Sequence, residues 1–139
     1  MQPVVSWFRT AGGATRAPAV ILAVAASMVA AQVHAWAAPE HLSLQPLLGV
    51  GFLVTAFLQG SYAAALMSRT DSVWLIRLGL VGNVALILLG LAAHNPDNPI
   101  GVWLAHQHAP GTQLLEQMAV ASEAATVAGL AHLLTARRR

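Results

Sequence analysis

The sequence has few of the groups that a water-exposed surface needs, and it has no cysteine. Only 9% of its 139 residues are charged, against about 25% in an ordinary soluble domain. Without cysteine the chain has no disulfide, no thiolate metal ligand and no cysteine nucleophile. Aromatic residues make up 6%, and all the basic residues are arginine. These deficits exclude a typical soluble domain, because such a domain must cover itself with polar side chains.

The residues that are present form long uncharged hydrophobic runs, and 57% of the chain is hydrophobic. The first run, 17–38, would extend about 33 Å as a helix, which is enough to cross a bilayer. Three further runs, 47–67, 73–93 and 113–136, have similar lengths. The sequence therefore predicts an all-α, integral membrane four-helix bundle, with one membrane domain over residues 1–139 that has the lipid bilayer as its main partner.

The arginines predict the orientation of the bundle, since arginines near the ends of spans stay on the cytoplasmic side. With the N-terminus inside, all seven lie on one side: Arg9, Arg16, Arg69, Arg77, Arg137, Arg138 and Arg139. We therefore expect a multi-pass protein of the cell membrane, in a bacterium the inner membrane, with N- and C-termini cytoplasmic. The Pro- and Asn-rich segment 94–112 becomes the one substantial outer loop.

A cleaved signal peptide is the competing interpretation of the first run. Arg9 and Arg16 precede it, and Ala35-Trp36-Ala37 has the form of a cleavage site. Cleavage there would leave three spans. The apolar run is longer than the 7–15 residues of a usual signal core, which favours an uncleaved first helix.

Glu123 is the most informative polar residue, because a carboxylate inside a span costs several kcal/mol unless it is paired, protonated or hydrated. We expect it to face the bundle interior. Candidate partners at a similar depth are His34 and Gln32 of the first run and Gln45 near the start of the second. A contact between His34 and Glu123 would join the first and fourth helices. Gln59 and Asn83 are predicted to form interhelical polar contacts. Such contacts commonly join membrane helices with no chemistry attached.

Several histidines and carboxylates fall on the predicted outer side and could form a polar site there. The candidates are His34, Glu40, His41 and Glu123, joined by His94, His106 or His108. Imidazole and carboxylate together suit Zn or Cu. Their spacing is not that of a helical metalloenzyme motif, so interfacial histidines with ordinary solvent contacts are the simpler explanation. A haem held by His34 and His94 is disfavoured, because both lie near the surface and few aromatic rings are available.

Other functional classes find no support in the sequence. The nucleophile motifs Gly-x-Ser-x-Gly and Ser-x-x-Lys, the phosphate loop and the dinucleotide fingerprint are all missing. The sequence therefore gives no positive sign of an enzyme. The arginines lie between spans rather than along one basic face, which argues against nucleic-acid binding.

The segment His34-Ala35-Trp36-Ala37-Ala38-Pro39-Glu40-His41 has the pattern H-x4-PEH. Together with Phe52, Gln59, Asn83 and Glu123 it resembles small uncharacterised four-span membrane proteins of high-GC bacteria. The loop residues His106-Gln107-His108 depart from that pattern. The resemblance implies the four-span topology and marks polar positions, but it implies no activity.

Three functions remain open from the sequence. The favoured one is an accessory or structural subunit of a membrane complex, with a membrane protein partner or a second copy of the chain. The second is a membrane protein that binds Cu or Zn on its extracytoplasmic side. The third is a small proton-linked carrier acting as an oligomer, since one short chain has little room for an alternating-access pathway.

Overall fold

The computed structural model describes residues 11–95, 97–99, 101–102 and 113–137. These ranges contain four long helices, α1 (Ala11–Leu44), α2 (Pro46–Ser68), α3 (Val73–Ala93) and α5 (Gln113–Ala136). All four are long and apolar enough to cross a bilayer. A helix satisfies its own backbone hydrogen bonds, which a span needs because lipid offers no alternative partner. The predicted all-α, four-helix membrane fold is confirmed.

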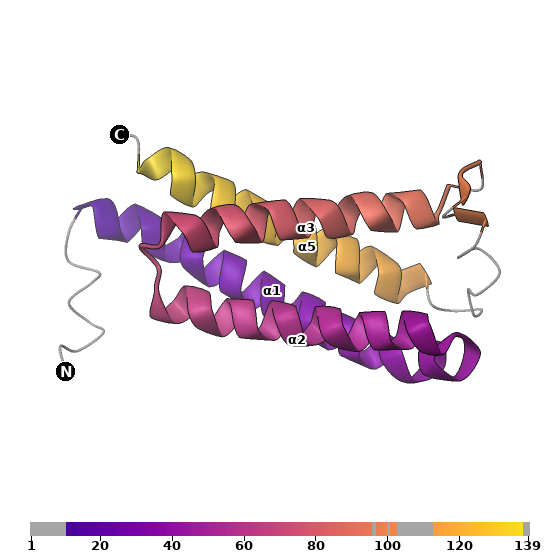
Figure 1. Ribbon diagram of the computed structural model, residues 1–139. Coiled ribbons are helices and arrows are strands. Elements are labelled where there is room, and N and C mark those ends of the chain that lie inside the picture. Colours follow the sequence, from indigo (N-terminus) through magenta and orange to yellow (C-terminus); the bar gives the residue numbers. More distant parts are fainter. Residues whose placement is uncertain (1–10, 96, 100, 103–112, 138–139) are drawn as a thin grey trace.

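The helices form an elongated bundle in which α1 and α5 lie between the other two (Figure 1). Helix α1 packs against α2 and α5, and α5 also packs against α3. Helices α2 and α3 are joined by the short link 69–72, yet they touch each other little and diverge away from that link (Figure 1). The start of α1 and the end of α5 lie at the same end of the bundle as this link.

We call that end the arginine end, because Arg16, Arg69 and Arg137 lie there, and the opposite end the histidine end, after His41 and His94. At the arginine end, Asp71 in the link connects two other segments of the chain. Its carboxylate lies 3.2 Å from the Arg16 guanidinium and 3.6 Å from that of Arg137. Arg137 also donates a hydrogen bond to the Thr70 carbonyl at 3.1 Å. The α2–α3 link is thus tied to the start of α1 and the end of α5.

The hydrophobic core lies in the half of the bundle nearest the arginine end, where all four helices contribute to it. Its buried members are Ala19, Ala23, Leu66, Ile76, Leu130 and Leu133. A side chain at Gly129 on α5 would meet the Ala19 carbonyl and the backbone of Ala23, so glycine lets α1 and α5 approach closely there.

Gly79 is a second glycine at a close contact, and it lets α3 approach Tyr62 of α2. A Cβ at this position would overlap the Tyr62 hydroxyl and crowd Leu130. Tyr62 from α2 therefore lies directly over the glycine. The two helices close together at this level, although they separate further along the bundle.

Helix α1 continues beyond the predicted span 17–38 and includes both Pro18 and Pro39. The predicted span ended before Pro39, a residue that lacks the N–H that a helix interior uses. The helix instead continues to Leu44. The His41 ring donates a hydrogen bond to the Ala37 carbonyl at 2.8 Å, which gives the turn around the proline an additional bond.

A single residue, Gln45, separates α1 from α2. The chain reverses there with Pro46 in the first turn of α2, where a missing N–H costs nothing. A side chain at Gly49 would overlap the backbone of Leu42, so glycine is required for the end of α1 to lie against α2.

The described part of the predicted outer loop 94–112 begins with a turn that is tied to α3. Asn98 donates from its side chain to the Ala92 carbonyl at 2.9 Å and accepts from the Gly101 N–H at 2.7 Å. Residues 103–112, and with them His106 and His108, lie outside the described residues.

Candidate functional site

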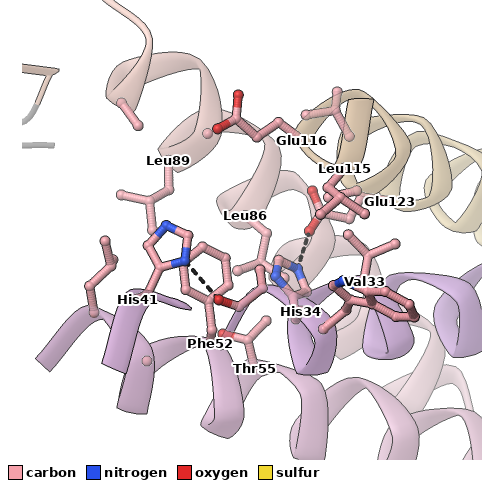
Figure 2. Close-up of a pocket in the computed structure, with 18 of the residues that line it drawn as sticks. Val33, His34, His41, Phe52, Thr55, Leu86, Leu89, Leu115, Glu116 and Glu123 are labelled. Carbon is pink, nitrogen blue, oxygen red and sulfur yellow. Dashed lines mark hydrogen bonds and ion pairs between the residues drawn. The ribbon is translucent and has the colours of Figure 1, made fainter. Parts of the chain in front are cut away.

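A cavity of about 670 Å³ occupies the half of the bundle nearest the histidine end. It lies where α2 and α3 have separated, and all four helices line it. Most of its wall is apolar, with Leu48 and Phe52 from α2, Leu86 and Leu89 from α3 and Leu115 from α5. Figure 2 shows the polar side chains between these apolar ones.

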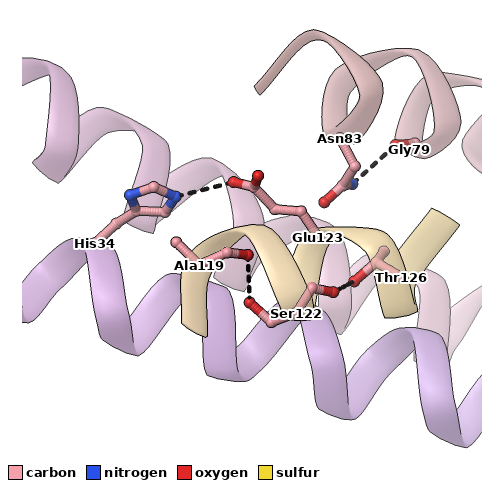
Figure 3. A network of polar contacts seen from close by, with 7 residues as sticks. All are labelled: His34, Gly79, Asn83, Ala119, Ser122, Glu123 and Thr126. Carbon is pink, nitrogen blue, oxygen red and sulfur yellow. Dashed lines mark hydrogen bonds and ion pairs between the residues drawn. The ribbon is translucent and has the colours of Figure 1, made fainter. Parts of the chain in front are cut away.

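The most buried polar pair of the cavity is His34 of α1 and Glu123 of α5. Their side chains meet with 3.2 Å between Nε2 and Oε1, and the residues are only 8% and 2% exposed (Figures 2 and 3). His34 was one of three partners that the sequence offered for Glu123, and the structure brings these two side chains together. A carboxylate this deeply buried is stabilised by a hydrogen-bonding partner on the neighbouring helix.

The second ring nitrogen of His34, Nδ1, is buried and has no hydrogen-bond partner among the described residues. Phe52 lies beside the ring, with 5.5 Å between the ring centroids, and cannot supply one. When Nε2 carries the proton and donates it to the Glu123 carboxylate, Nδ1 has a lone pair and is an acceptor. A buried polar atom left in this state costs about 1–3 kcal/mol, which a donor arriving from the cavity would offset.

A second histidine–carboxylate pair lines the same cavity nearer to the histidine end. His94, just beyond α3, lies with its Nε2 2.7 Å from Oε2 of Glu116, and its Nδ1 donates to the Gly90 carbonyl at 2.7 Å. Glu116 precedes Glu123 by two helical turns, about 10 Å along α5. The two pairs therefore stand at different levels of one cavity.

The contacts of His94 raise its pKa above the ordinary value of 6.5, first through the bond to the Gly90 carbonyl and then through Glu116. The physical cause is that both partners are acceptors. A ring that donates from both nitrogens must be an imidazolium, so the geometry favours the protonated form.

His41 and Glu40 also line the cavity, at the end of α1. The His41 ring packs against Phe52 with 4.5 Å between centroids, so Phe52 lies between His41 and His34. Glu40 is exposed. Thus five of the seven residues in the predicted outer site, all but the undescribed His106 and His108, line one cavity. His94 joins it through Glu116 rather than through Glu123.

Glu116 was missing from the predicted site, although its sequence position carried a usable signal. It lies seven residues before Glu123, which places both on one face of α5. Thr55 of α2 also lines the cavity. The sequence gave no comparable reason to expect it there, since a single hydroxyl in an apolar span is common.

The two amides predicted to join helices bond differently. The Asn83 side chain donates to the Gly79 carbonyl of its own helix at 2.8 Å (Figure 3). The contact at Gln59 uses its backbone, whose carbonyl accepts from Ser27 of α1 at 3.1 Å. Among the described residues, Oδ1 of Asn83 and both polar side-chain atoms of Gln59 are buried without partners. A side-chain amide can turn back to its own backbone, which spacing alone does not reveal.

Within the described ranges, no three His, Asp or Glu side chains come close enough together to hold a metal ion. His34 and His94 instead each pair with one carboxylate. This arrangement suits the exchange or sharing of a proton better than tetrahedral coordination, which needs three or four ligands.

No protein-family model matches this chain, and no curated protein or solved structure is detectably similar to it. The functional argument therefore rests on the geometry of the cavity.

Proposed function

We propose that the chain is a multi-pass protein of the bacterial cell membrane that binds a small amphipathic molecule in the cavity at its histidine end. The observation that carries the proposal is a buried, unpartnered Nδ1 of His34 in the wall of a mostly apolar cavity. Ligand pockets have this character, since apolar walls bind the body of a ligand while a few polar atoms orient it.

The size of the cavity supports this function. Its volume of about 670 Å³ lies within the range of roughly 300–1,000 Å³ that is usual for small-molecule sites. Helices α2 and α3 both line it and diverge toward the histidine end (Figure 1), so we expect a ligand to enter at that end.

The orientation follows from charge. Arg16, Arg69 and Arg137 lie at the arginine end, which the positive-inside rule places in the cytoplasm together with both termini. The cavity then opens to the extracytoplasmic side. An alkaline phosphatase fused to the C-terminus should be inactive, and an active fusion would contradict this orientation.

Filling the cavity tests the function. Gly51 lines it, and a Cβ at this position meets no atom within 4 Å, so Gly51→Phe adds a ring to the cavity wall from a position where the backbone leaves room for a side chain. Gly82 on α3 has equally open surroundings but does not line the cavity, which makes Gly82→Phe the matched control. Binding of phenylbutanol to the full chain in zwitterionic nanodiscs is measured by calorimetry, with empty nanodiscs subtracted.

The unaltered chain and Gly82→Phe should bind phenylbutanol saturably, and Gly51→Phe should bind it at least about tenfold more weakly. A signal that never saturates, or one that is equal in all three chains, would mean that the probe enters only the lipid and would refute the proposal.

The role of accessory subunit stays a prediction of the sequence. Helices α2 and α3 expose broad apolar faces, with Phe57 and Val81 among the most exposed side chains, and both lipid and a protein partner can cover them. Recovery of a stoichiometric partner after purification in mild detergent would support it.

A further inference from the structure

We propose that the ligand of this cavity is a protonated amine attached to an apolar body. The inference rests on the proposed function and names the chemical class that the site selects. It depends on three features of the cavity: the charged side chains of its wall, the unpartnered ring nitrogen of His34, and the aromatic side chains.

The described side chains that line the cavity carry negative charge without fixed positive charge. Three carboxylates line it, those of Glu40, Glu116 and Glu123, and neither arginine nor lysine does. The imidazoles of His34, His41 and His94 are the only basic groups in this wall, and α2 contributes no titratable group to it. A carboxylate or phosphate ligand would find no arginine or lysine to bind, and the His94 ring is already bonded to Glu116. An ammonium group would be attracted to the carboxylates.

His34 adds a requirement for a hydrogen-bond donor. Its Nε2 lies 3.2 Å from the Glu123 carboxylate. A neutral ring that donates from Nε2 has a lone pair on Nδ1 that can accept a hydrogen bond. This atom is buried and has no partner among the described residues. His34 lines the cavity, so an ammonium N–H that reaches Nδ1 would satisfy it and bring positive charge close to Glu123. A quaternary ammonium group has the same charge but no N–H, so it leaves Nδ1 unsatisfied.

The remaining wall fits a cation with an apolar body. Phe52 and Trp36 both line the cavity, and aromatic faces attract an ammonium group that has lost part of its hydration. The leucines of α2 and α3 contact the body of the ligand. Together these features distinguish an amphipathic amine from a fatty acid, a neutral alcohol and a free metal ion.

Four probes that share one apolar body test the proposal on the unaltered full-length chain. They are phenylbutylamine, phenylbutyltrimethylammonium, phenylbutanol and phenylbutyrate, each titrated into zwitterionic nanodiscs at about pH 8, where an ordinary histidine is neutral and the amine is charged. The amine should bind about tenfold more tightly than the alcohol and the trimethylammonium probe. The carboxylate should bind most weakly.

Two substitutions assign the preference to individual atoms. Glu123→Gln removes the charge but keeps the shape, and it should lower the affinity for the amine to that for the alcohol. His34→Gln places an amide near the position of Nε2 and removes Nδ1, so the amine should lose its advantage over the trimethylammonium probe. Asp71→Asn, which removes a carboxylate at the arginine end outside the cavity, is the matched control and should leave the order of the four affinities unchanged.

The outcomes distinguish the preference for an amine from the proposed binding of a small amphipathic molecule. Equal affinities for amine and alcohol, or an amine affinity unaffected by Glu123→Gln, would overturn the amine preference while leaving a binding cavity in place. No saturable binding of any probe would overturn both. The four-probe comparison on the unaltered chain decides the question even where a variant fails to fold.

Discussion

The two ends of this bundle are built from the same four helices but are held together differently. At the arginine end, small residues let the helices approach closely, and Asp71 forms ion pairs with Arg16 and Arg137. At the histidine end, α2 and α3 separate around a cavity whose polar contacts are histidine–carboxylate pairs. The comparison shows that the arginine end holds the helices together, whereas the histidine end has room for the ligand that we propose.

Disrupting the close packing should have the largest effect on stability. Gly129→Leu would place a side chain against the Ala19 carbonyl and the backbone of Ala23, which cannot move without separating α1 from α5. We expect a loss of about 3 kcal/mol, at the upper end for overpacking. Thermal unfolding in detergent measures it, and Gly82→Leu, in open surroundings, should lose little. Equal losses in both variants would show that the α1–α5 contact is not tight.

Separating the buried pair should have the next largest effect. His34→Ala leaves Glu123 buried without its partner, and the unsatisfied group should cost about 2 kcal/mol. Glu123→Gln should keep the fold, since an amide can also hydrogen-bond to the ring. Thermal unfolding of both single variants and of the double variant gives the coupling energy between the two side chains. A coupling near zero would show that the contact contributes nothing to stability.

The ion pairs at the arginine end should contribute less than the packing beneath them. Asp71→Asn removes both of its pairs, but the Asp71 side chain is 59% exposed, so solvent screens them. We expect a loss of about 1 kcal/mol or less, and it should shrink further as salt is added. Thermal unfolding at low and high salt checks this. A loss as large as that of Gly129→Leu would mean that charge, rather than packing, holds this end together.

The smallest expected effect is a dependence of stability on pH at the histidine end. The pKa of His94 is raised in the fold, so its stabilising contribution is full below 6.5 and is lost as the pH rises through the raised value. The difference in melting temperature between the unaltered chain and His94→Gln should therefore narrow as the pH increases. A melting-temperature difference that widened as the pH increased would show that the fold lowers the pKa of His94 instead of raising it. Glu116→Gln removes one cause of the raised His94 pKa. In that background the melting-temperature difference should therefore narrow at a lower pH.

Hydropathy was enough to predict the four helices, because a span must be apolar over its whole length whatever its neighbours are. The contact of His34 with Glu123 was also predictable, since both were expected at a similar depth and each needs a partner away from water. Depth does not give the rotation of a helix about its axis. For this reason the bond of His94 to Glu116 was missed.

Local backbone chemistry explains the other differences from the sequence-based predictions. The predicted span 17–38 stopped short of Pro39, yet α1 continues to Leu44 with the His41 ring bonded to Ala37. Asn83 was expected to join two helices, yet its amide bonds to Gly79 of its own helix. In each case a side chain bonds to the backbone one turn earlier, and hydropathy contains no information about that choice.

The distance along the chain between His34 and Glu123 has a consequence for biosynthesis. The two residues are 89 positions apart, and a ribosome adds about 5–20 residues per second. The imidazole is therefore made roughly 5–20 seconds before its carboxylate partner. During that interval α1 and α2 must remain in the membrane or the translocation channel with the ring bonded to something else, either water or the insertion machinery. Completion of the polar pair therefore has to wait until α5 has been synthesised.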